Sequence, residues 1–168
     1  MKSKINKTQK KRQMNAVAVF RSGPVEGEVL VEPYKTGIKV RATFTKLPEG
    51  KHGFHIHKAG DLRGEGCQGA CSHFHIGTPM DHGSEPTGKK GQIRHTGDLG
   101  NIELGKDEKM KTYTYILQDC KVHDLFGRAM IVHADEDDLG LGTEDDSKTT
   151  GHSGARIGCA IFGRATGC

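Results

Sequence analysis

Short stretches in which apolar and polar residues alternate recur along the chain, and glycine, proline and other turn-forming residues separate them. The clearest covers residues 37–45, where every second side chain from residue 38 onward is apolar. Side chains of a β-strand alternate between two faces, so this pattern predicts a strand with one buried face. Comparable stretches predict further strands at residues 15–20, 27–32, 53–57, 100–104, 112–117, 129–133 and 156–164.

Two long stretches between these predicted strands, residues 58–97 and 134–155, show no sustained periodicity and are rich in glycine. Loops of this length inside a compact domain are usually functional or disordered, and the histidines of the first stretch favour function. The chain shows no convincing amphipathic helix or internal repeat. We therefore expect an all-β fold, an eight-stranded antiparallel Greek-key sandwich or flattened barrel with two long functional loops.

Length and composition agree with this fold class and exclude others. A chain of 168 residues corresponds to one domain of ordinary size. Its 24 glycines, its lack of Trp and its apolar content of 33% argue against a helical bundle. No stretch approaches the roughly 18 apolar residues of a membrane span, so we expect a soluble protein without a membrane partner.

Positive charge is concentrated at the start of the chain. Residues 1–13 carry six of the 25 Lys and Arg residues and none of the 21 acidic ones, so the remainder has a formal charge of −2. We expect residues 1–14 to form a solvated, disordered basic tail rather than a nucleic-acid-binding segment, and residues 15–168 to form the domain. The apolar stretch 16–20 is too short for a signal peptide, which predicts an intracellular, cytoplasmic location.

Histidines cluster in the middle of the chain, where seven of the ten fall within residues 52–95. Imidazole is the commonest metal ligand in proteins, so the cluster favours a metal site. If residues 53–57 form a strand, Phe54 and Ile56 face the core while His55 and His57 project together from the other face. That pair would supply half of a metal site; the alternative is a solvent-facing strand edge with two unlinked histidines.

Further metal donors follow the pair. His95 and Asp98 are three residues apart, and Gly97 between them permits a turn that brings both side chains to one cation. Three nitrogen ligands with one oxygen ligand suit a closed tetrahedral zinc site. His133 ends the predicted buried strand 129–133 and could join His55 and His57.

Several motifs occur together in one order. The chain contains GFHIH at 53–57, GC at 66–67 with a histidine six residues after the cysteine, RHTGDLGN at 94–101, IVHADEDDLG at 131–140 and GARIGCAIFG at 154–163. In these motifs the chain resembles the eukaryotic-type copper–zinc superoxide dismutases over residues 15–168. The resemblance implies an enzyme that converts superoxide to dioxygen and hydrogen peroxide, at a copper ion that alternates between +2 and +1 beside a zinc ion.

The resemblance also implies roles for particular residues. It assigns the copper ion to His55, His57, His73 and His133 and the zinc ion to His73, His82, His95 and Asp98. His73 would bridge both ions and deliver a proton to peroxide. Asp137 would link a copper histidine to a zinc histidine. Arg156 would anchor the superoxide anion. Cys67 and Cys159 would form a disulfide, whereas Cys71, Cys120 and Cys168 would stay free thiols.

The chain departs from the family pattern at several positions. Lys148 lies one position earlier than the usual lysine of the acidic loop, and the loop between His73 and His95 is longer and includes residues 88–91. His75 replaces the usual asparagine and is expected to be a surface residue rather than a competing ligand. Arg164 and Ala59 weaken the expectation of the usual homodimer. The remaining histidines, His52, His123 and His152, are expected at the surface.

Three rival functions remain open at this point. A catalytically silent copper-delivery or metal-binding relative would lack a copper ligand or Arg156, and both are present. A copper-only dismutase would lack the zinc residues. A basic-tailed binding protein would use the sandwich as a scaffold, and removal of residues 1–13 separates that function from catalysis. A copper-delivery protein is an expected partner of an active dismutase.

Overall fold

A computed structural model describes residues 14–87, 92–118 and 120–166. Apart from Met14, the basic tail predicted at residues 1–14 lies outside this part, as do residues 88–91 and Cys168. The described strands are β1 (Asn15–Phe20), β2 (Glu26–Tyr34), β3 (Gly37–Lys46), β4 (His52–His57), β5 (Asp98–Ile102), β6 (Lys111–Leu117), β7 (Ala129–His133), β8 (Arg156–Ile161) and β9 (Gly163–Ala165). Three short helical segments accompany them, the kinked 3-10 segment η1 (Glu65–Ala70) and the single turns α1 (Val122–Leu125) and α2 (Ser147–Thr150).

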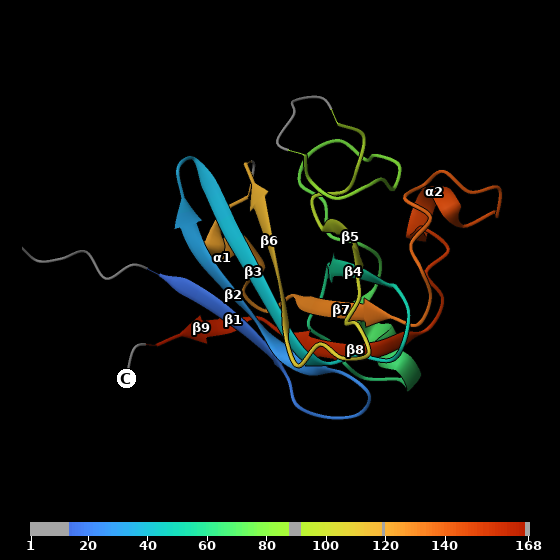
Figure 1. The fold of residues 1–168 in the computed structure, drawn as a ribbon. Coiled ribbons are helices and arrows are strands. Elements are labelled where there is room, and N and C mark those ends of the chain that lie inside the picture. Colours follow the sequence, from blue (N-terminus) through green and yellow to red (C-terminus); the bar gives the residue numbers. More distant parts are fainter. Residues whose placement is uncertain (1–13, 88–91, 119, 167–168) are drawn as a thin grey trace, which may run out of the picture.

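The strands form two antiparallel sheets that face each other (Figure 1). One sheet has the strand order β6-β3-β2-β1-β9 and the other the order β5-β4-β7-β8. This arrangement confirms the predicted all-β sandwich. Within the described part of the chain, no helix is long and apolar enough to cross a membrane.

The predicted strand 156–164 is wrong in one respect, because it divides into two strands that belong to different sheets. The break falls at Phe162, whose side chain is buried and whose amide donates to the carbonyl of Arg128 at 2.9 Å. β8 pairs with β7, whereas β9 pairs with β1. The apolar alternation continues across the break because both halves face one core, so the pattern alone does not reveal it.

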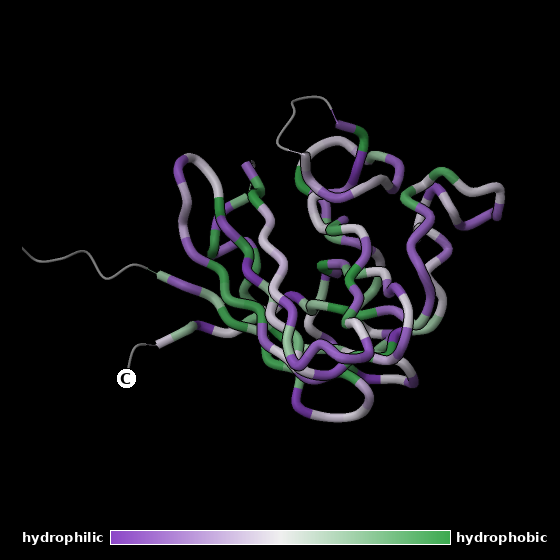
Figure 2. Tube along the Cα trace, viewed as in Figure 1, coloured by the Kyte–Doolittle hydropathy of each residue, from purple (hydrophilic) through white to green (hydrophobic). Residues whose placement is uncertain are grey.

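The alternating side chains of both sheets fill the space between them, where apolar positions gather in Figure 2. Phe44 of β3 meets Phe54 of β4 edge to face, with ring centroids 5.4 Å apart. Fully burying a phenylalanine side chain stabilises the fold by about 2–3 kcal/mol, so this contact holds β4 firmly against the opposite sheet. The outward face of β4 is therefore a rigid base for the long loops.

Backbone hydrogen bonds fasten both long loops to this base. The amide of Phe74 donates to Ile56 at 2.8 Å, and the amide of Ile56 donates to Gly97 at 2.9 Å. Gly97 is required for this approach because a Cβ atom there would overlap the carbonyl oxygen of Ile56. In the second loop, the carbonyl of Asp135 accepts from the amide of Gly53 in β4 at 2.9 Å. The two loops thus converge over β4 and β7.

Candidate metal centre

β4 and β7 present three histidines from the face opposite the core. His55 and His57 are 0% and 1% exposed, while Phe54 and Ile56 point into the core. The alternative of a solvent-facing strand edge is therefore wrong. β4 pairs with β7, which ends at His133 beside them, and the loop residue His73 forms a bridge with His57.

The structure brings together four of these imidazoles, those of His55, His57, His73 and His133. One ring nitrogen from each lies within 4.8 Å of the others. His57 donates from Nδ1 to the carbonyl of Cys71 at 2.8 Å, and His133 donates from Nδ1 to Gly154 at 3.2 Å. In the neutral rings both Nε2 atoms are consequently unprotonated and free to coordinate a metal.

A second donor set surrounds Asp98, which opens β5 and is fully buried. The Nδ1 atoms of His73, His82 and His95 lie 2.8, 3.1 and 3.2 Å from its Oδ1 atom. The Oδ2 atom accepts hydrogen bonds from the amides of Gly83 and His95 at 3.0 and 2.7 Å, which fixes the orientation of the carboxylate. Three imidazoles and one carboxylate at these distances suit a tetrahedral zinc ion.

His73 belongs to both sets. Its Nδ1 atom faces Asp98, whereas its Nε2 atom joins the set around His55 and His57. A single imidazole can serve two metals only if both nitrogens lose their protons, so this side chain joins the two sites chemically as well as spatially.

Asp137 links the two sets from behind. Its Oδ2 atom accepts a hydrogen bond from Nε2 of His55, and its Oδ1 atom accepts one from Nε2 of His82, both at 2.8 Å. Asn101 holds the Asp137 backbone through two reciprocal hydrogen bonds of 2.8 Å. Protons on these Nε2 atoms leave Nδ1 of each histidine for a metal. Sequence analysis missed Asn101, although it lies in the RHTGDLGN motif.

The donor atoms themselves test whether metals fit. Within the described chain, three of the buried side-chain atoms that lack a hydrogen-bond partner are nitrogens of these histidines, namely Nδ1 of His55, Nε2 of His73 and Nδ1 of His82. An unsatisfied buried polar atom is costly, about 1–3 kcal/mol each. All three atoms belong to the two donor sets, and a metal in each set would satisfy them. The residues present therefore fit one ion in each set.

Burial keeps the histidines of the first donor set, His55, His57, His73 and His133, neutral. It lowers the pKa of His55, His57 and His73, and it lowers the pKa of His133 to about 4. Neutral imidazole is the form that binds metal, so these side chains coordinate at neutral pH without first losing a charge.

The second set is charged in the metal-free protein. Burial alone would lower the pKa of His82, but its hydrogen bond to Asp137 and the nearby Asp98 carboxylate raise that pKa to about 9. Burial would likewise raise the pKa of Asp98, but the three histidines around its carboxylate, His73 first, hold that pKa far below its ordinary value. A zinc ion bound here would displace the proton of His82.

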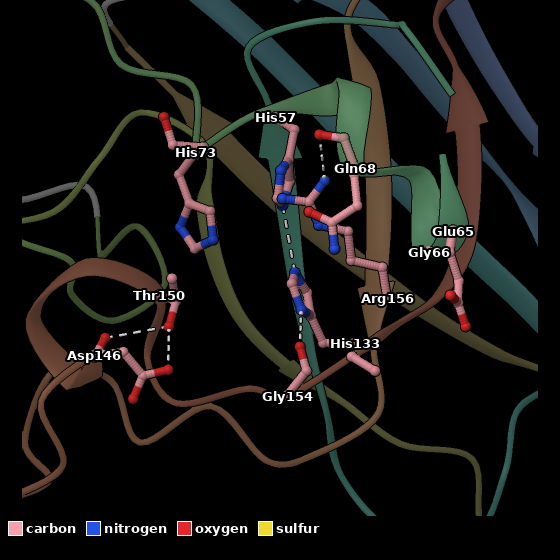
Figure 3. A pocket seen from close by; sticks show the side chains of 12 residues that line it. His57, Glu65, Gly66, Gln68, His73, His133, Asp146, Thr150, Gly154 and Arg156 are labelled. Atoms are coloured by element: carbon pink, nitrogen blue, oxygen red, sulfur yellow. Dashed lines mark hydrogen bonds between the residues drawn. The ribbon is translucent and has the colours of Figure 1, made fainter. Parts of the chain in front are cut away.

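A cavity of about 670 Å³ opens above the first set and is lined by His57, His73, His133 and Arg156 among others (Figure 3). Arg156 donates from Nη1 to the carbonyl of Cys67 and from Nη2 to that of Cys71, both at 2.6 Å. The predicted disulfide between Cys67 and Cys159 is confirmed, and it ties η1 to β8 beside this arginine. The disulfide and the two carbonyls hold the guanidinium at the cavity wall.

Lys148 does not line this cavity. It lines a neighbouring cavity of about 340 Å³ with His75 and His95, and its Nζ atom donates to the carbonyl of Gly140. The next residue, Thr149, lines the same neighbouring cavity, whereas Thr150 lines the cavity above the histidines.

The prediction of a surface position is wrong for His52. That side chain is 2% exposed, and its Nδ1 atom lies 3.0 Å from the carbonyls of His133 and Ala134. Its even spacing from Phe54 and Ile56 places it on the core face, a signal that the alternation contained. His123 and His152 are exposed as predicted.

His75 is half-buried and both of its ring nitrogens have partners. Its Nε2 atom donates to the carbonyl of Thr78 at 2.7 Å, and its Nδ1 atom accepts from the amide of Thr96 at 3.1 Å. The ring also lies edge-on to His95, with centroids 5.9 Å apart. His75 is thus neither a competing ligand nor a plain surface residue, but a link between two segments of the loop.

An antiparallel sandwich that joins two donor sets through one histidine is the architecture of a binuclear metalloprotein. A family model described as "Copper/zinc superoxide dismutase (SODC)" matches residues 25–162, and the chain belongs to this family. It is 44% identical over 159 residues to a superoxide dismutase (Cu-Zn) of Paramecium bursaria Chlorella virus 1, covering 92% of this chain and 80% of that protein.

Two further comparisons agree. The chain is 38% identical over 153 residues to superoxide dismutase (Cu-Zn) 5 of Dictyostelium discoideum, covering 89% of this chain and 97% of that protein. The crystal structure of the clock protein EA4 matches with a TM-score of 0.76 and 32% identity, covering 89% of this chain and 93% of that one.

Proposed function

We propose that this protein converts two superoxide anions and two protons into dioxygen and hydrogen peroxide, with His73 shared between a copper and a zinc ion. The observation that carries the proposal is the arrangement of His73, whose two ring nitrogens enter two separate donor sets. Both sets contain every residue type that their metal requires.

The two metals would be held by different atoms of these sets. The first set would hold copper through Nδ1 of His55 and Nε2 of His57, His73 and His133. The second would hold zinc through Nδ1 of His73, His82 and His95 and the carboxylate of Asp98. Copper, when bound, supplies one-electron exchange by alternating between +2 and +1, whereas zinc keeps one oxidation state.

Arg156 would bind the substrate. Its guanidinium keeps its charge at any working pH and offers five donors. Two of them bind the carbonyls of Cys67 and Cys71, and Nη1 also lies 3.5 Å from the carbonyl of Gln68. The remaining donors are available to a small anion that enters the cavity. The two carbonyls orient the guanidinium before the anion arrives, which reduces the entropy lost on binding.

His73 would supply one proton to the product. Its Nε2 atom lies on the cavity side and is the position that would carry the proton transferred to peroxide. Its Nδ1 atom stays directed at Asp98, so the ring keeps its orientation while Nε2 gains and loses a proton. Asp137 would keep His55 and His82 in their required tautomers.

Superoxide removal by purified protein loaded with both metals tests these roles. We expect His133→Ala to abolish nearly all activity, and Arg156→Ala to lower it by about 10- to 100-fold through loss of a charged donor. The matched controls His123→Ala and Arg41→Ala alter exposed side chains away from the cavity and should keep full activity. Equal activity in all five proteins would refute the assignments.

The rival functions make different predictions. A copper-only dismutase would have no use for the donor set around Asp98, which supports a two-metal enzyme. A basic-tailed binding protein would depend on residues 1–13, so deleting them would abolish its association with polyanions. We expect that deletion to leave superoxide removal unchanged.

Assembly and location are further proposals. The exposed apolar side chain of Ile161 in β8, at 44% exposure, supports a homodimer, whereas the charge of Arg164 in the following strand β9 opposes one. Sedimentation at micromolar concentrations distinguishes the two. Cytoplasmic location and a copper-delivery partner are tested by cell fractionation and by copper occupancy in cells that lack such partners.

A further inference from the structure

The charge around the cavity differs from what an anion-attracting channel requires. Among the described residues that line it, Arg156 is the only lysine or arginine, whereas Glu65 and Asp146 are both acidic. Lys148 points into the neighbouring cavity. An approaching superoxide anion therefore meets a field in which the two carboxylates matter as much as the guanidinium.

Asp146 is held at the cavity wall opposite Arg156 (Figure 3). Its Oδ2 atom accepts a hydrogen bond from Oγ1 of Thr150 at 2.9 Å. Its Oδ1 atom lies 2.7 Å from Nδ1 of His152, a half-exposed side chain just beyond α2. Asp146 thus has a titratable counter-ion, and His152 lies outside both metal donor sets.

His152 is surrounded by acids. The hydrogen bond to Asp146 and the charge of Asp146 raise its pKa, desolvation opposes this, and Glu144 and Asp138 raise it further. Protonated His152 neutralises Asp146, so the wall carries one less uncompensated negative charge. Neutral His152 leaves the Asp146 carboxylate facing the entering anion.

We propose that His152 sets the charge of this wall and thereby the rate at which superoxide reaches Arg156. The inference rests on the proposed function and adds a positioning pair, His152 and Asp146, that acts on substrate entry. Capture is faster when His152 is protonated and slower when it is neutral. The effect is modest because one unit charge beside a water-filled channel changes an encounter rate about twofold.

The second-order rate constant for superoxide decay, measured by pulse radiolysis on the metal-loaded enzyme, tests the proposal. At low salt, we expect this rate constant of the wild type to fall about twofold as the pH rises from about 6 to 9. His152→Asn should remain at the lower value throughout. Asp146→Asn should never fall below the wild type's low-pH value, and should exceed it near pH 6, where its own His152 becomes protonated. At about 0.15 M ionic strength the differences should shrink, because the Debye length falls to about 8 Å.

The control is His123→Asn. That histidine forms a similar exposed pair with Asp124, at 3.4 Å, but does not line the cavity. It should keep the wild-type profile. Metal content and melting temperature, measured for every variant, confirm that only surface charge has changed.

An NMR titration of the His152 ring provides a readout independent of turnover. We expect its pKa to lie above 6.5 in the wild type and to fall toward 6.5 in Asp146→Asn. If loaded wild-type protein removes no superoxide, the proposed function itself fails. If the loaded wild-type protein removes superoxide, and both His152→Asn and Asp146→Asn show its pH profile and salt dependence, the dismutase function stands. The proposed role of the pair is then refuted.

Discussion

The Nε2 atoms of His57 and His133 lie 3.3 Å apart although neither carries a proton in the neutral rings. In each ring the single proton is on Nδ1, which donates it in a hydrogen bond to a backbone carbonyl. Two lone pairs at this distance repel each other, and a cation between or beside them removes the repulsion. The backbone therefore enforces a geometry that favours metal binding.

The same geometry predicts that the metal-free protein is sensitive to acid. The folded-state pKa of His133 is about 4, while an unfolded histidine titrates near 6.5. Below pH 6.5 this histidine binds a proton in the unfolded chain but not in the folded chain. The free energy of unfolding therefore falls as the pH drops toward 4. Between pH 7.5 and 4.5 we expect the titration of His133 alone to lower the free energy of unfolding by about 2–3 kcal/mol.

Denaturant unfolding of chelator-treated protein at both pH values measures this cost. Metal-free His133→Asn should lose about 2–3 kcal/mol less on acidification than metal-free wild type. His123→Asn, a change at the surface, should behave like the wild type. An identical loss in wild type and His133→Asn would contradict the prediction.

Gly151 is expected to be essential for the hydrogen bond between Asp137 and His82, one of the residues that would bind zinc. A Cβ atom there would overlap Oδ1 of Asp137 and Nε2 of His82, which would separate the two. We expect Gly151→Ala to weaken zinc binding by about 10- to 100-fold, the usual effect of losing a partner behind a ligand. Competition with a chromogenic chelator measures the affinity.

Gly23→Ala is the matched control for Gly151→Ala. Both glycines have a positive φ, +77° and +69°, but nothing lies within 4 Å of a Cβ at Gly23. The control therefore introduces the same backbone strain without the overlap. If both variants lose the same zinc affinity, backbone strain and not the overlap causes the loss, which would contradict the prediction.

The disulfide is expected to support activity through Arg156. Without the bond from Cys159 to Cys67, η1 is free to move, and the carbonyls that hold the guanidinium move with it. Cys159→Ser should lower the free energy of unfolding by about 2–5 kcal/mol. It should also reduce superoxide removal at temperatures where the protein stays folded.

The exposed free thiol Cys71 provides the control. Cys71→Ser keeps the backbone carbonyl that Arg156 uses, so activity and stability should stay near wild type. Normal activity in folded Cys159→Ser would show that the carbonyls keep their positions without the bond.

His75 is expected to retain zinc indirectly. Removing its ring breaks the link from Thr96, which adjoins His95, to Thr78. His75→Ala should release zinc to a chelator about tenfold faster. His75→Asn retains one donor and one acceptor and should restore part of the retention; release at the wild-type rate in His75→Ala would count against this role.

The residue pattern predicted most of the strands and the common face of His55 and His57. Strand periodicity is a property of neighbouring residues, so residues 37–45 reveal their buried face without knowledge of the rest of the fold. The ligand sets were predicted by family resemblance, because spacing alone does not bring His73 and His133 together.

Only the tertiary structure decided how distant segments meet. The break at Phe162 depends on which sheet each half joins, and the orientation of Lys148 depends on the path of the loop around α2. The pairing of His152 with Asp146 likewise follows from that path. Such contacts are set by chain closure and packing over long sequence distances, and a local pattern of side chains carries no information about them.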